Sequence, residues 1–189
     1  MGVKMVCVGN EKFICNGSEL DITVLDFWRF TYSDLNSDPR DYLAEFLVSK
    51  ALGIDTPYNK EAWTLFDILY VNTRVEVKCT GYFQTWRTDD KVSQNRYYSI
   101  KPAHDKVKNT FERQNDIYVF CLLLGNTREE ANPLNLNNWE FYIVPTSVIN
   151  KECQEANTIR LGRIKKMGYK ALGFYDIKNE IDKIIQETN

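Results

Sequence analysis

Histidine is almost absent from this sequence, and its cysteines are few and scattered. His104 is the only histidine among 189 residues, and the five cysteines include no CxxC pair. Structural zinc sites need several closely spaced Cys or His ligands, so we expect none here. The odd number and wide spacing of the cysteines also argue against a disulfide framework. A reducing, cytoplasmic location is therefore expected.

Long apolar runs and an excess of positive charge are missing too. No stretch approaches the roughly 20 residues that cross a bilayer, and the apolar run at the N-terminus is too short for a signal peptide. We therefore expect no membrane association. The formal net charge is −2, so no general positive field attracts nucleic acid. Nucleic acid would need a local basic patch, or metal ions that neutralise acidic residues at the phosphate.

The sequence contains no internal repeat, low-complexity tract or linker rich in proline and glycine. Its length is typical of one domain, and we expect residues 1–189 to form one. With 43% hydrophobic and 13% aromatic residues, the chain can bury a substantial core. A phosphate-cradling glycine loop and a histidine-based site are both lacking, which disfavours an enzyme that acts on small molecules.

The spacing of apolar residues predicts both helices and strands. Asp38 suits a helix N-cap, Pro39 the first helical position and Gly53 the C-terminal stop of one helix. Helices are predicted over 21–35, 38–53 and 175–188; strands are predicted in a hairpin over 63–83 and over 97–101, 116–125 and 139–149, the last stopped by Pro145. This pattern indicates an α/β or α+β domain with a central mixed sheet.

Three charged residues converge in the predicted hairpin. A two-residue turn at Asn72-Thr73 sets Asp67 opposite Lys78, and Glu76 shares a face with Lys78 because side chains alternate along a strand. Two carboxylates a few ångströms apart repel unless positive charge lies between them. A divalent cation is the natural solution, since Mg²⁺ is usually held by one or two carboxylates with water and substrate phosphate.

An acidic residue two positions before a lysine is not a specific signal. The same pattern occurs at Asp89-Lys91 and Asp176-Lys178, and charges that alternate along a strand usually form its solvated face. The occurrence at Glu76-Lys78 differs because it lies in an apolar strand with an aspartate on the partner strand. A solvated face and a catalytic centre therefore both remain open from spacing alone.

Asp67, eight intervening residues and then Glu76-Val77-Lys78 resemble the motif of the PD-(D/E)xK nuclease superfamily. The runs LDFWRFTYSDL, RDYLAEFLVSKALGI and FDILYVNTRVEVKCTGYFQTW are similar to a group of bacterial proteins of that superfamily, as are RQNDIYVFCLL and NWEFYIVPTSVI. The likeness spans roughly residues 20–185. It implies an α/β, restriction-endonuclease-like fold, in which a central mixed β-sheet is flanked by α-helices.

The resemblance also implies roles for individual residues. Asp67 and Glu76 would be metal ligands, helped by the backbone carbonyl of Val77, and Lys78 would activate the attacking water. Phe66 stands where the superfamily name has proline, a position where that proline is commonly absent.

Two further residues match the superfamily less directly. Glu45, in LAEFL, matches a helical glutamate that many members aim at the same centre, although it can equally border the core. Gln84, in GYFQTW, matches a glutamine that contacts the metal site in related enzymes, or it is a hydrogen-bonded loop residue.

The function implied by the resemblance is hydrolysis of DNA phosphodiester bonds, dependent on Mg²⁺ or Mn²⁺, by an activated water. Many members of the superfamily cut two strands as homodimers, so a homodimer is one expected state. One alternative is a non-catalytic nuclease-like module that binds nucleic acid or protein. Another is a nuclease directed at RNA or at DNA repair.

Two basic clusters could hold backbone phosphates. The first lies within residues 87–113, where seven Lys/Arg are interleaved with Tyr97, Tyr98 and Phe111. Lys165 and Lys166, with Arg160, Arg163 and Lys170 nearby, form the second. A solvated surface is the more common explanation of such clusters.

Overall fold

The structure is a computed structural model that describes residues 7–37, 39–54, 65–83, 96–105 and 109–188. The chain divides into two compact units, Met1–Leu35 and Asn36–Asn189. No helix in the described part of the chain is long and apolar enough to cross a membrane. The expectation that residues 1–189 form a single domain stays a prediction.

The first unit is a hairpin followed by a helix. Strands β1 (Lys12–Cys15) and β2 (Ser18–Thr23) are antiparallel, and helix α1 covers Val24–Tyr32. Thr23 caps this helix, because its side chain and the Asp26 carboxylate bond each other's backbone N–H groups. The helix predicted over 21–35 is therefore confirmed in part, but its first residues belong to a strand.

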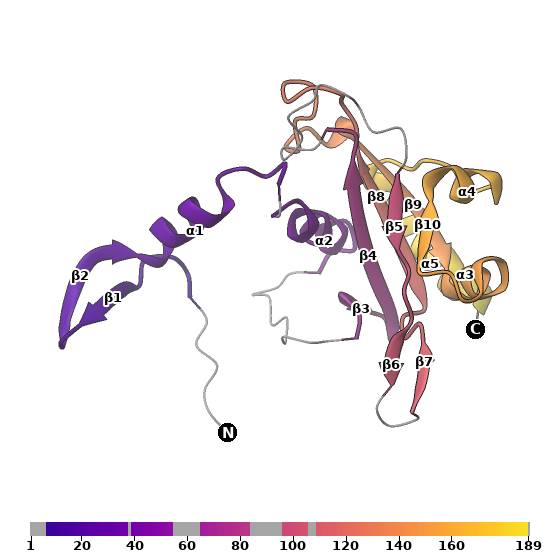
Figure 1. Cartoon of the computed structure of the whole chain (residues 1–189), viewed down its shortest axis with the longest axis horizontal. Helices are drawn as coiled ribbons and strands as arrows, with labels where there is room; N and C mark the ends of the chain where they lie inside the picture. Colours follow the sequence, from indigo (N-terminus) through magenta and orange to yellow (C-terminus); the bar gives the residue numbers. More distant parts are fainter. Residues whose placement is uncertain (1–6, 38, 55–64, 84–95, 106–108, 189) are drawn as a thin grey trace. The chain divides into compact units, whose positions relative to one another are not determined.

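The second unit is built on a four-stranded sheet with the order β3-β4-β8-β9 (Figure 1). The strands are β3 (Ile68–Tyr70), β4 (Thr73–Gly81), β8 (Ile117–Leu123) and β9 (Trp139–Pro145). Strands β4 and β8 are parallel, whereas the other neighbours are antiparallel. The predicted mixed sheet is confirmed, and the architecture is mixed α/β.

Helices and short strand pairs complete this unit. The helices are α2 (Pro39–Ala51), α3 (Thr146–Cys153), α4 (Leu161–Lys166) and α5 (Ile177–Thr188), with 3-10 turns η1 (Leu136–Asn138) and η2 (Phe174–Asp176). Two antiparallel pairs join β5 (Tyr97–Ser99) to β10 (Thr158–Arg160) and β6 (Ala103–Asp105) to β7 (Thr110–Glu112).

Most of the predicted elements of this unit form. Helix α2 begins at Pro39, and Gly53 follows it with a φ of 72°, as a helix stop requires; its predicted N-cap, Asp38, lies outside the described residues. The strand predicted within 139–149 and stopped by Pro145 is confirmed, because β9 ends at Pro145 and residues 146–153 are helical. Proline cannot donate to a sheet ladder, and its fixed φ suits the residue before a helix.

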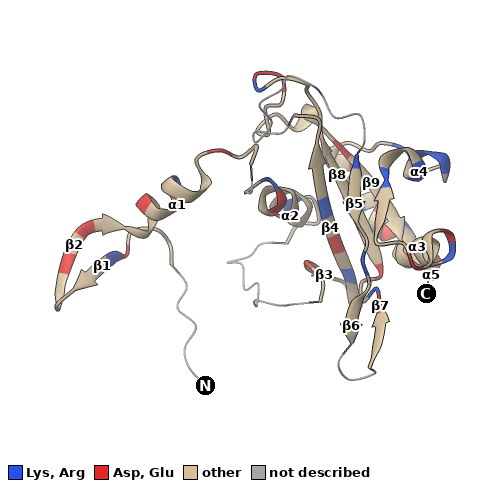
Figure 2. Ribbon diagram, viewed as in Figure 1, with Lys and Arg blue, Asp and Glu red and all other residues tan. Residues whose placement is uncertain are grey.

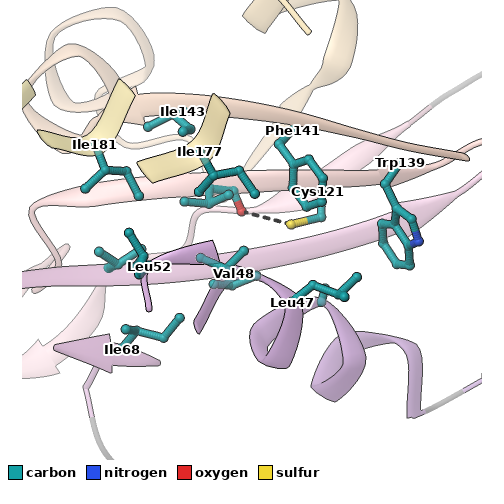
Figure 3. Close-up of a cluster of buried hydrophobic side chains, with 14 of the residues drawn as sticks. Leu47, Val48, Leu52, Ile68, Cys121, Trp139, Phe141, Ile143, Ile177 and Ile181 are labelled. Carbon is teal, nitrogen blue, oxygen red and sulfur yellow. Dashed lines mark hydrogen bonds between the residues drawn. The ribbon is translucent and has the colours of Figure 1, made fainter. Parts of the chain in front are cut away.

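Each face of the sheet packs against a separate core layer. We call the layer under α2 and α5 the first core layer (Figure 3). The second core layer lies under α3, α4 and the β5–β10 pair, on the opposite face. Buried members of the first are Ala44, Leu47, Val48, Leu52, Ile68, Val75, Val77, Ile117, Val119, Cys121, Leu123, Ala131, Trp139, Phe141, Ile143, Ile177, Ile181 and Ile184. Buried members of the second are Tyr98, Ile100, Tyr118, Phe120, Leu122, Tyr142, Val144, Ile149, Ile159, Leu161 and Ile164.

The alternation of side chains along β4 decides which face the charged residues occupy. Val75 and Val77 belong to the first core layer, so Glu76 and Lys78 point to the other face. In the parallel register with β8, Glu76 lies beside Tyr118, a member of the second core layer. The charged pair therefore borders the second core layer.

Candidate active site

The predicted register of the central hairpin is wrong, because its turn lies one residue earlier than predicted. The turn is Val71-Asn72, with φ values of 46° and 62°, and Tyr70 faces Thr73 across it. Continued along the strands, this register sets Asp67 opposite Glu76 rather than Lys78. Moving a two-residue turn by one position shifts the pairing by two residues, so every side chain keeps the face that the sequence predicted.

Asp67 lies at the outer edge of β4. Its Oδ2 accepts a hydrogen bond from the backbone N–H of Val77 at 2.8 Å, and its own N–H donates to the Val75 carbonyl at 3.1 Å. Strand β3 pairs only with Thr73–Val75. The Asp67 carboxylate thus accepts the Val77 N–H bond that a backbone carbonyl would accept if β3 continued alongside Val77.

The backbone of Val77 faces the same edge. Asp116 N–H donates to the Arg74 carbonyl on the β8 side of β4, and the direction alternates from residue to residue. Both polar backbone groups of Val77 therefore point away from β8, towards Asp67. This places a backbone carbonyl and a carboxylate at one point on the edge of the sheet.

Glu76 and Lys78 form an ion pair on the neighbouring face. Lys78 Nζ lies 2.5 Å from Glu76 Oε1, and the two side chains are 31% and 19% exposed, lysine first. Burial raises the pKa of Tyr118 to about 12; the charge of Arg113 lowers it, and that of Glu76 raises it further. The negative charge of Glu76 thus acts within the second core layer as well as at its surface.

The oxygen atoms at this point fit a hard divalent cation in kind. Carboxylate and carbonyl oxygens are the ligands that Mg²⁺ takes in proteins, and Asp67, Glu76 and Val77 supply both types. One oxygen of each carboxylate is already engaged, by the Val77 N–H and by Lys78. Within the described ranges, no three or more His, Cys, Asp or Glu side chains are grouped so as to hold a metal ion.

The structure does not place all five predicted side chains in one cluster. Glu45 is 9% exposed on α2, whose Ala44 and Val48 pack in the first core layer. It therefore approaches the sheet from the face opposite Glu76 and Lys78. Gln84 lies outside the described residues.

An ion pair that the sequence did not reveal lies at the start of β4. Arg74 donates to Asp116 from Nη2 at 2.7 Å, from Nε at 3.0 Å and from its backbone N–H at 2.8 Å. These bonds raise the pKa of Arg74 and lower that of Asp116, whose charge they stabilise. The pair lines a cavity of about 660 Å³. Its members lie 42 residues apart, so no local pattern could have indicated it.

Comparisons with known proteins assign no family to this geometry. The sequence matches no protein-family model and no curated protein.

Proposed function

We propose that this protein is a metal-dependent nuclease of the restriction-endonuclease-like fold that hydrolyses DNA phosphodiester bonds. The observation that carries the proposal is the hydrogen bond from the Val77 N–H to the Asp67 carboxylate. This bond fixes the Asp67 carboxylate at the edge of β4, the strand that contains Glu76 and Lys78. Three consecutive residues of β4 then supply the carboxylate of Glu76, the backbone carbonyl of Val77 and the amine of Lys78. Asp67 supplies the second carboxylate from the neighbouring segment.

Asp67, Glu76 and the Val77 carbonyl would hold Mg²⁺ or Mn²⁺. The bound cation would stabilise the negative charge that develops on the phosphate and lower the pKa of a bound water. The hydrogen bond from Val77 constrains Asp67 through Oδ2. Such positioning of ligands before substrate arrives reduces the reorganisation that the reaction requires.

Lys78 Nζ donates a hydrogen bond to Glu76, one of the proposed ligands. As an ammonium it donates to Glu76 and can equally donate to a phosphate oxygen. In its neutral form, the same nitrogen can take the proton of an attacking water. Tyr118 and Phe120 lie beside the pair in register and keep bulk water from its inner side.

The Glu76–Lys78 ion pair also favours a second candidate function. Lys78 neutralises Glu76 directly, so the site holds no strong excess of negative charge to attract a cation. A nuclease-like domain that binds nucleic acid without cutting it would have this property.

Cleavage assays separate the two functions. Wild type and Lys78→Ala are incubated with supercoiled plasmid, single-stranded DNA and RNA, each with Mg²⁺, Mn²⁺ or EDTA. We expect metal-dependent cleavage of DNA by the wild type and a loss of about 10²–10⁴-fold in Lys78→Ala, the usual contribution of a positioned proton-transfer group.

Lys183→Ala is a matched control. Lys183 also pairs with a glutamate, Glu187, at 4.0 Å, but on the exposed side of α5. This variant should cleave as the wild type does. Cleavage by Lys78→Ala at the wild-type rate would sink the catalytic assignment, whereas binding without cleavage by any variant would support the second function.

A further inference from the structure

A second cavity, of about 720 Å³, lies where β4 ends, and the charged side chains that line it are mainly positive. Tyr82, directly after β4, forms one wall, and the segment from β10 through α4 forms another. We call it the basic pocket. Its charged lining residues are Arg96, Arg160, Arg163, Lys165, Lys166 and the single acid Glu152. The chain as a whole carries a net charge of −2, so this concentration of positive charge is local.

The fold positions two of these arginines by stacking them on tyrosines. The Arg96 guanidinium lies 4.4 Å from the ring centre of Tyr82 and donates to the Tyr82 carbonyl at 3.3 Å. Arg160 lies 5.0 Å from the ring centre of Tyr97, its partner in the β5–β10 register. Arg96 is buried and supports the wall of the pocket. Arg160 is exposed, so stacking leaves the edge of its guanidinium available for phosphate oxygens at reduced entropic cost.

The lysines and arginines of β10 and α4 differ in how far nearby acids neutralise them. Arg163 bonds Glu152 at 2.8 Å, and Lys165 lies 3.9 Å from Glu140. Arg160 and Lys166 have no carboxylate within ion-pair distance among the residues that the structure describes. Figure 2 shows positive residues at the end of β10 and along α4. The basic pocket therefore retains positive charge that its own acids do not neutralise.

The basic pocket lies on the same face of the sheet as the proposed catalytic pair. Its wall residues Ile159 and Leu161 belong to the second core layer, which Glu76 and Lys78 border. Tyr82 follows Lys78 by four residues, about 13 Å along an extended strand at about 3.3 Å per residue. A duplex presents one phosphate per strand about every 3.4 Å along its axis. One nucleic-acid strand can therefore reach both the pocket and the pair.

We infer that the basic pocket binds the phosphodiester backbone of the nucleic-acid strand whose scissile bond lies at Glu76 and Lys78. This inference rests on the proposed function and adds a binding site for the substrate to it. A strand fits better than a lone phosphate, because the exposed cations are distributed over β10 and α4 and can contact several phosphates at once. Contacts to backbone phosphates carry no sequence information, so this binding is independent of base sequence.

Binding of a fluorescently labelled 20-nucleotide DNA by the full chain in EDTA tests the inference without any cleavage. The double variant Arg160→Gln/Lys166→Gln is compared with the wild type and with the control Lys151→Gln/Lys183→Gln. We expect Kd to rise about 10-fold in the pocket variant. The magnitude of the slope of log K against log salt should fall by about 1.4–1.8, as the loss of two phosphate contacts requires. The control should match the wild type in both.

Unchanged Kd and salt slope in the pocket variant would overturn the inference, as would a wild type that binds no DNA. Inorganic phosphate that competes as well as an unlabelled strand, at equal phosphate concentration, would also overturn it. Both variants change exposed side chains, and circular dichroism checks their folding. If the pocket variant binds DNA more weakly but the wild type does not cleave, the pocket inference stands and the nuclease proposal fails. If the wild type cleaves and the pocket variant binds DNA as the wild type does, the nuclease proposal stands and the pocket inference fails.

Discussion

Asp67 and Val77, ten residues apart, are joined by a hydrogen bond of 2.8 Å from the Val77 backbone to the Asp67 carboxylate. The bond gives Asp67 a structural role that is separate from any role in catalysis. It completes the edge of β4 at the point where β3 no longer pairs with it. Variants of Asp67 can therefore separate the charge of the side chain from its function as an acceptor.

Asp67→Asn should fold normally yet lose metal-dependent cleavage, because the amide oxygen can still accept from Val77 but carries no charge. Asp67→Ala should lower the free energy of unfolding by about 1–3 kcal/mol, since it leaves a backbone donor without its partner. Urea unfolding and calorimetric titration with Mn²⁺ measure the two effects. Equal destabilisation by Asn and Ala would show that the charge of Asp67, rather than its acceptor, holds the edge.

The Glu76–Lys78 pair should show measurable coupling in a double-mutant cycle with Glu76→Gln and Lys78→Met. We expect about 1 kcal/mol in the free energy of unfolding, more than exposed pairs give, because both side chains are mostly shielded from solvent. Chemical denaturation in EDTA provides the measurement. The same cycle at the exposed pair Lys183–Glu187 should give coupling near zero, and an equal value at both sites would contradict this interpretation.

Asp116 should make the stability of the protein depend on pH below about pH 5. Hydrogen bonds from Arg74 lower the pKa of Asp116 below its ordinary value of 3.8. The unfolded state therefore binds a proton more readily. The stabilisation is complete above the unfolded pKa and is lost as pH falls through the folded pKa.

Asp116→Asn should therefore reduce stability at pH 7 by about 1 kcal/mol or less, because both side chains are partly exposed and solvent screens the pair. The difference from wild type should disappear in strong acid. Thermal unfolding between pH 2 and pH 7 tests this, with Glu155→Gln as an exposed control. A difference that grows as pH falls would contradict the assigned sign.

The hairpin turn offers a stabilising substitution. Val71 has a φ of 46°, a conformation that a β-branched residue adopts only under strain, and its side chain is exposed. Replacing Val71-Asn72 with Asn-Gly supplies the residues that this turn type prefers. We expect the free energy of unfolding to rise by about 1 kcal/mol. As a contrast, Gly17→Ala should lower the free energy of unfolding, because Gly17 has a φ of 77° in the turn of the β1–β2 hairpin. No gain in stability from Asn-Gly at 71–72 would show that the backbone at Val71 is not strained.

Periodicity determined much of the fold because it depends on neighbouring residues. Pro39 and Gly53 delimit α2, and the continuous apolar run at 116–125 predicted a strand buried on both faces. Alternation along β4 predicted that Glu76 and Lys78 share a face. That face survived the error in the turn, since a shift of two residues preserves the alternation.

Non-local pairing was beyond the sequence for equally physical reasons. The turn at Val71-Asn72 has none of the usual turn residues at its first position, so tertiary packing overrode local preference there. The short strands β6, β7 and β10 and helix α4 have too few residues to show a period. Arg74 meets Asp116 only because β4 and β8 are parallel neighbours.

For the candidate site, the sequence by itself determined the residue types, their order along β4 and the face that each side chain takes. The tertiary structure decided the rest. It set Asp67 at the sheet edge against Val77, paired Glu76 with Lys78 and packed α2, which carries Glu45, on the other face. It also gathered Tyr82, Arg96 and the α4 cations into one pocket. Side-chain alternation is a property of consecutive residues, whereas these contacts join segments that only the packing of two core layers brings together.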